Sequence, residues 1–135
     1  MKLFLFSSCL LLACSGAAHA QAPATFAPLA TYPTGGSISL RVVTGDLNGD
    51  GRVDAVTANI TSNNVSVFLN TGDGNFAAAA RYAVAPAGVQ AQGVTLGDVN
   101  ADGRLDIVTA NNGNNTVGVL LAQAGGGFAA VSTYT

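Results

Sequence analysis

The sequence has no glutamate and no tryptophan, and its one lysine, one histidine and both cysteines all precede residue 20. Beyond that point the chain has no disulfide, no thiol nucleophile and no imidazole. The basic side chains that remain are four arginines, at positions 41, 52, 81 and 104. Because nucleic-acid binding depends on clustered lysine and arginine, we expect no nucleic-acid partner. Acid–base catalysis needs a histidine or paired carboxylates with adjusted pKa values, so the composition predicts a protein that is not an enzyme.

The N-terminus has the pattern of a secretion signal. Lys2 precedes an apolar stretch from Leu3 to Ala13, and residues 18–20 read A-H-A, an A-x-A cleavage site. We therefore expect a signal peptide over 1–20 and a secreted, periplasmic or cell-surface protein over 21–135. The stretch is too short to span a membrane, which needs about 20 apolar residues. The alternative is a lipobox, LLAC, with Cys14 lipidated and the protein anchored there; the chain is exported in both cases.

Six of the seven aspartates lie in two segments of the same design, DLNGDGRVD at 46–54 and DVNADGRLD at 98–106. Side-chain oxygens stand at positions 1, 3, 5 and 9, and glycine at position 6 allows a turn that brings the carbonyl of position 7 inward. Calcium takes about 6–8 oxygen ligands, so the spacing predicts two calcium (Ca²⁺) sites. The predicted ligands are Asp46, Asn48, Asp50, the Arg52 carbonyl and Asp54, and in the second loop Asp98, Asn100, Asp102, the Arg104 carbonyl and Asp106.

These loops have two alternative interpretations. An EF-hand needs a glutamate at position 12 between two helices, but Thr57 and Thr109 stand there. The residues that follow each loop, AVTAN and IVTAN, are typical of a strand instead. A turn that binds nothing is the second alternative, because aspartate, asparagine and glycine are common in turns.

Beyond the signal the chain is a repeat with an offset of 52 residues, so that Asp46 recurs as Asp98 and Val65 as Val117. Periods near this size indicate propellers, solenoids or arrays. Each unit predicts four short strands separated by turns rich in asparagine and glycine. The predicted strands cover 42–44, 53–58, 65–69 and 76–82 in the first unit, and 94–96, 105–110, 117–121 and 128–134 in the second.

The fourth strand of each unit carries a phenylalanine and a tyrosine six positions apart, Phe76 with Tyr82 and Phe128 with Tyr134. An even separation in a strand places both side chains on one face. Phe26 and Tyr32 have the same spacing, which predicts an extra strand over 26–32 that belongs to neither unit.

The segment GVTLGDVNADGRLDIVTANNGNNTVGVLLAQAGGGF, residues 93–128, resembles the FG-GAP/VCBS-type repeat, the blade of integrin-α-like propellers and of many bacterial surface proteins. The resemblance implies an all-β fold of β-propeller-type four-stranded blades with calcium in the hairpin between a blade's first two strands. It covers two repeats, at about 34–82 and 83–135. Because VTAN stands where integrin repeats carry a Gly-Ala-Pro element, integrin-like ligand recognition is not implied.

Propellers close with typically 4–8 blades, so two whole blades and an orphan N-terminal strand predict a partial propeller. We expect the N-terminal part of a longer propeller with a structural or adhesive role, and a glycan or extracellular protein as the ligand. The Asn-rich turns, with Asn63, Asn64, Asn114 and Asn115, are the candidate binding surface. One alternative is a scaffold in which two-blade chains assemble into a homo-oligomeric ring. Another is a non-catalytic accessory domain of a polysaccharide-acting enzyme.

Overall fold

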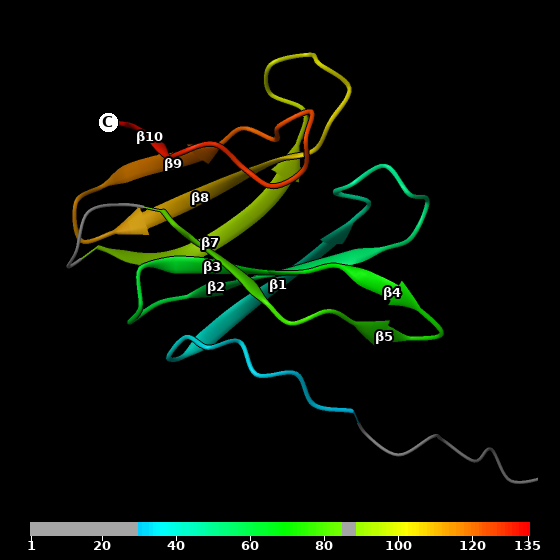
Figure 1. Ribbon diagram of the computed structural model, residues 1–135. Helices are drawn as coiled ribbons and strands as arrows, with labels where there is room; N and C mark the ends of the chain where they lie inside the picture. The colour runs from blue at the N-terminus through cyan, green and yellow to red at the C-terminus, as the bar shows by residue number, and fades with distance from the viewer. Residues whose placement is uncertain (1–29, 85–88) are drawn as a thin grey trace, which may run out of the picture.

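The structure is a computed structural model that describes residues 30–84 and 89–135. These residues form strands, turns and irregular segments without any helix, which confirms the all-β prediction (Figure 1). No helix long and apolar enough to cross a membrane occurs in the described ranges. The predicted signal peptide and the predicted lipidation site at Cys14 lie outside the described residues.

Eight of the strands form two antiparallel sheets in which each strand lies beside the next (Figure 1). The first sheet has the order β1 (Ser39–Gly45), β2 (Asp54–Asn59), β3 (Asn64–Phe68) and β6 (Ala80–Ala83). The second sheet contains β7 (Gln90–Gly97), β8 (Asp106–Asn112), β9 (Thr116–Leu120) and β10 (Ser132–Tyr134). A separate hairpin pairs β4 (Asn70–Gly72) with β5 (Asn75–Phe76). The valine-rich segments of both units supply the β-branched residues that strands favour.

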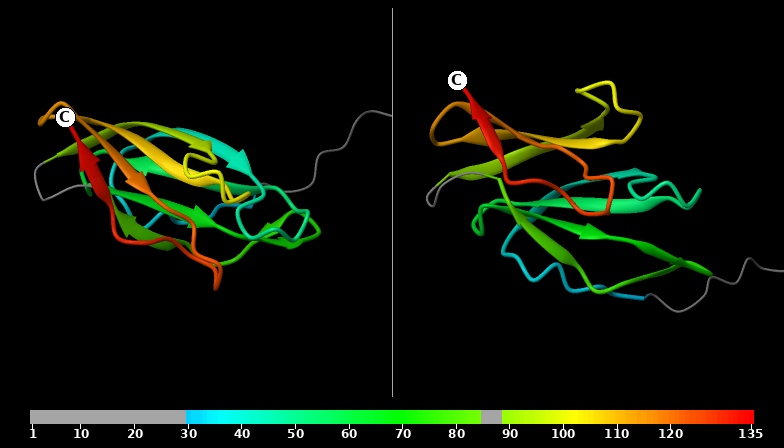
Figure 2. Two further views of the ribbon diagram at one scale, coloured as in Figure 1. Left: turned by 90° about the horizontal axis from the view of Figure 1, so that it is seen from above. Right: turned by 45° about the horizontal axis from the view of Figure 1, so that its top comes forward.

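The two sheets stack face to face, and the core lies between them (Figure 2). In β3, Val65 and Val67 point into this core, whereas Ser66 and Phe68 point to the opposite face of the first sheet. The second sheet contributes Ile107 and Leu120, both fully buried. The alternation of side chains along β3 therefore decides which of its residues are covered by the second sheet.

The predicted extra strand over 26–32 is not found in its described part. Residues 26–29 lie outside the described residues, and Ala30–Tyr32 belong to no strand. The segment instead runs along the first sheet on the face away from the second sheet (Figure 2). It is held there by side-chain contacts, because Tyr32 packs edge-on against Phe68 and Phe76 and the Ser66 hydroxyl donates to the Thr34 carbonyl.

The predicted fourth strands begin later than expected. Phe76 pairs with Asn70 in the separate hairpin, residues 77–79 belong to no strand, and β6 starts only at Ala80. This interruption breaks the two-residue alternation, so the prediction that Phe76 and Tyr82 share a face is wrong. Phe76 packs against Tyr32, while Tyr82 pairs with Val65 and packs against Phe128 of the second unit.

We predict that Gly118→Ala destabilises the fold. A Cβ atom at Gly118 in β9 would lie 2.6 Å from the Thr109 hydroxyl and 2.7 Å from the Val84 backbone carbonyl. Forcing an atom into such packed space costs about 1–3 kcal/mol, which denaturant unfolding would measure. Gly97→Ala in β7 is the matched control, because a Cβ there meets nothing within 4 Å. Equal unfolding free energies for the two variants would contradict the close approach of Val84 to β9.

Candidate metal centre

The first predicted loop joins β1 to β2, and its opening aspartate closes the loop on itself. The Asp46 carboxylate accepts hydrogen bonds from the backbone N–H groups of Gly49 at 2.8 Å, Asp50 at 3.2 Å and Gly51 at 2.8 Å. Gly51 has a φ of 79°, a left-handed conformation that glycine adopts without steric cost. The turn expected at position 6 is thus present.

Asn48 and Asp50 lie together at the exposed tip of the loop. The Asn48 amide donates to an Asp50 carboxylate oxygen at 2.7 Å, and the Asp50 N–H donates to the Asn48 side-chain oxygen at 3.1 Å. The Arg52 guanidinium also pairs with Asp50, at 2.5 Å. The sequence prediction considered only the Arg52 carbonyl and missed this ion pair. The side chains of Asn48 and Asp50 thus meet at the tip, and the Asp46 carboxylate is joined to them through the backbone N–H of Asp50.

Asp54 lies apart from this tip and is almost fully buried. One of its carboxylate oxygens accepts the N–H of Leu47 at 2.9 Å, and the other accepts the N–H of Asn70 at 2.7 Å. The side chain thus links the start of the loop, the start of β2 and the chain that leaves β3. Asp54 therefore fixes the loop against its sheet. Nothing in the sequence identified Asn70 as a partner of Asp54.

The second loop, between β7 and β8, repeats this arrangement. Asp98 accepts from the N–H groups of Asp102 at 3.1 Å and Gly103 at 2.8 Å, and the Asn100 amide donates to Asp102 at 2.7 Å. Arg104 pairs with Asp102. The buried Asp106 accepts from the N–H groups of Val99 at 3.0 Å and Ala122 at 2.8 Å. Two loops with different neighbours therefore have nearly the same local hydrogen bonds.

Hydrogen bonds in both loops favour ionised carboxylates. The N–H of Gly51, donating to Asp46, lowers the pKa of that carboxyl below its ordinary value. The side-chain amide of Asn100, donating to Asp102, lowers the pKa of Asp102 in the same way. Both groups consequently carry negative charge at neutral pH, the state in which a carboxylate binds a cation.

As they stand, the described residues contain no group of three or more His, Cys, Asp or Glu side chains placed to hold a metal ion. The hydrogen bonds explain this, because Asp54 is turned into the fold and Asp50 is paired with Arg52. The donor set still fits a hard cation, since Asp46, Asn48 and Asp50 all carry side-chain oxygens within one short loop.

A comparison with known protein families finds a match over the region that contains both loops. Residues 46–109, which include both loops, match the family of the FG-GAP-like repeat. This region of the chain is of the FG-GAP repeat type. The resemblance expected from the second unit is confirmed by this match. No curated protein and no solved structure matches the chain.

We predict that Asp54→Ala destabilises the FG-GAP unit even when a chelator removes all divalent cations. The change leaves two N–H groups without their acceptor, and each such loss costs about 1–3 kcal/mol. Asp54→Asn keeps one acceptor oxygen and should lose less. Asp50→Ala is the control from the same loop, because its side chain lies at the exposed tip. If Asp54→Ala and Asp50→Ala had equal unfolding free energies in chelator, Asp54 would have no separate structural role.

Proposed function

We propose that this FG-GAP repeat protein is an exported, non-catalytic, calcium-binding module of β-propeller type with a structural role. The observation that carries the proposal is the duplication of one loop geometry. In each loop the first aspartate accepts a backbone N–H of the turn, and the asparagine and the second aspartate meet at an exposed tip. A buried aspartate holds each loop on its sheet. A turn with no ligand does not require the same carboxylates at the same places twice.

The chemistry of the tips favours calcium over other metal ions. After residue 20 the sequence has no cysteine and no histidine, so the softer ligands preferred by zinc and copper are absent. Each tip offers carboxylate and amide oxygens, which suit calcium. A bound ion would also supply positive charge that Arg52 and Arg104 now supply in part. Because this exported region has no disulfide, an ion that binds only the folded state would help to stabilise it.

The two sheets support a propeller-type arrangement. Each sheet has four antiparallel strands, and their order across the sheet is the same as their order along the chain. Four-stranded antiparallel sheets of this kind are the blades of propellers. The sheets stack through apolar side chains contributed by both units. We propose that they are two successive blades.

The Asn-rich turns favour a structural role over a ligand-binding one. Asn63 and Asn115 have positive φ values of 49° and 54°, a conformation that asparagine tolerates in turns. The Asn64 side chain donates to the Ser62 carbonyl, and the Asn114 side chain accepts from Thr116. Turn geometry therefore accounts for these four asparagines without a glycan or protein ligand.

We predict that calcium raises the melting temperature of the purified chain. Extracellular sites have Kd values of about 10⁻⁴ to 10⁻³ M, and a ligand at ten times Kd contributes about 1.4 kcal/mol per site. Asp50→Ala and Asp102→Ala should each remove about half of the gain, whereas Asp73→Ala, outside both loops, should keep it. A thermal-unfolding series with calcium and with chelator measures this. A melting temperature that does not respond to calcium would refute the proposed site.

We predict that magnesium stabilises the chain less than calcium at the same concentration. Mg²⁺ requires near-octahedral geometry at about 2.0–2.1 Å and gives up water reluctantly. The loop tips offer carboxylate and amide oxygens on exposed side chains, which suits a larger and less demanding ion. Melting curves in the two chlorides, compared with sodium chloride at equal ionic strength, make the comparison. Equal shifts for both ions would contradict calcium selectivity.

A further inference from the structure

The face of the second sheet that points away from the first sheet carries exposed residues whose repeat partners in the first sheet are buried. Val65 in β3 is fully buried against the second sheet, but its repeat partner Val117 in β9 is 42% exposed. Tyr82 packs in the core, whereas its partner Tyr134 is 60% exposed. Val108, Ala110 and Val119 lie on this same outer face, as the pairing of β8, β9 and β10 requires. We call this surface the outer face of the second sheet.

The complementary surface is exposed on the first sheet. Val94 in β7 is only 8% exposed because it packs against the first sheet, but its repeat partner Val42 in β1 is 63% exposed. Leu105 lies close to Gly45 of the first sheet, while its partner Val53 is exposed. We call this surface, on the side of β1 and β2 away from the second sheet, the open face of the first sheet. Within the chain, the face of the first sheet that contains Val65 packs against the face of the second sheet that contains Val94. The internal interface therefore joins one surface of each kind.

The N-terminal segment occupies part of the open face in the way that a preceding unit would. Tyr32 meets Phe76 with ring centroids 5.4 Å apart and an interplanar angle of 83°, and Tyr82 meets Phe128 at 5.3 Å and 79°. The carbonyl of Thr34 accepts a hydrogen bond from Ser66, and the carbonyl of Val84 accepts one from Asn111. Each acceptor stands two residues after its tyrosine.

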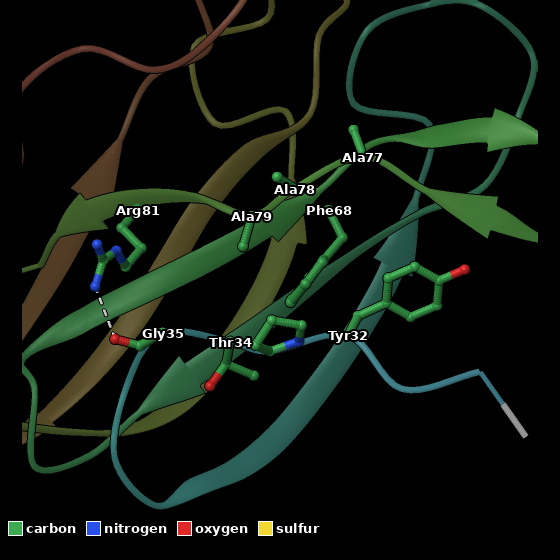
Figure 3. A pocket seen from close by; sticks show the side chains of 9 residues that line it. Tyr32, Thr34, Gly35, Phe68, Ala77, Ala78, Ala79 and Arg81 are labelled. Carbon is green, nitrogen blue, oxygen red and sulfur yellow. Dashed lines mark hydrogen bonds between the residues drawn. The ribbon is translucent and has the colours of Figure 1, made fainter.

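Further contacts hold the segment on the first sheet (Figure 3). The Arg81 guanidinium donates to the Gly35 carbonyl at 2.7 Å (Figure 3). The rings of Tyr32 and Phe68 pack edge-on, with centroids 6.5 Å apart. The segment covers the part of the sheet near β3 and β6, and leaves Val42 in β1 exposed. Tyr32 thus takes the position that the last tyrosine of a preceding unit would take.

We propose that a second copy of this chain binds the outer face of the second sheet with the open face of its first sheet. The contact repeats the interface that already joins the two sheets within one chain, and Tyr134 of one copy replaces Tyr32 of the other against Phe76. Each chain carries both halves of the interface, so association is head-to-tail and produces closed rings or open filaments. Residues 30–36 act as an internal competitor for this association. The inference does not depend on a bound cation.

Opposite effects of two tyrosine substitutions test the proposal. Sedimentation velocity of the purified chain over a concentration series measures the association, with circular dichroism to verify that each variant is folded. Tyr134→Ala should weaken association about tenfold or more, the loss expected for a buried aromatic anchor. Tyr32→Ala should strengthen association, because it removes the competitor. Changes in the same direction, or a chain that stays monomeric at every concentration, would overturn the proposal and leave both faces to a different partner.

A mixing experiment tests the head-to-tail geometry. Val117→Lys charges the outer face of the second sheet, and Val42→Lys charges the open face of the first sheet. Neither variant should assemble alone, but an equimolar mixture should form a one-to-one dimer, since each variant keeps the surface that the other lacks. Leu69→Lys is the control, because Leu69 and its repeat partner Leu121 are similarly exposed, at 38% and 37%, in both units. It should associate like the unmodified chain. A mixture that remains monomeric, or a control that fails to associate, would refute the interface.

Discussion

In each unit, the loop and its sheet depend on one buried aspartate. This aspartate accepts hydrogen bonds from two N–H groups in separate parts of the chain. Asp54 accepts those of Leu47 and Asn70, and Asp106 does the same in the second unit. A buried N–H without a partner is costly, so this carboxylate fixes the loop against the strand that follows it and the chain that leaves the third strand. The loop tip is therefore held at a defined place on its sheet before any ion binds.

The loops are also connected to the stacking of the sheets. Leu47, whose N–H is bound by Asp54, packs its side chain against the core between the sheets. Its repeat partner Val99 stands in the second loop and is exposed. Leu47 therefore connects the first loop to the interface between the sheets, and Val99 and Asn100 of the second loop lie beside Tyr134, on the surface that we propose for another copy.

The sequence was sufficient where a local pattern controls the structure. The strand predicted over 65–69 places Val65 and Val67 on one face, and both lie in the core. The short spacing in the first loop likewise brings Asn48 and Asp50 together. It failed where a distant contact decides. The strand expected over 76–82 is interrupted because Phe76 pairs with Asn70, and Ala30–Tyr32 are held by side chains of the first sheet without strand pairing. The burial of Asp54 depends on Asn70, which no motif identifies.

The central claim is that each FG-GAP loop binds one calcium ion. Calorimetric titration of the purified, chelator-treated chain with calcium tests it most directly, because the titration counts ions independently of any change in stability. The account predicts two ions per chain, and one ion per chain for Asp46→Ala or for Asp98→Ala. Heats no larger than those of dilution, or a stoichiometry of two that survives both substitutions together, would contradict it.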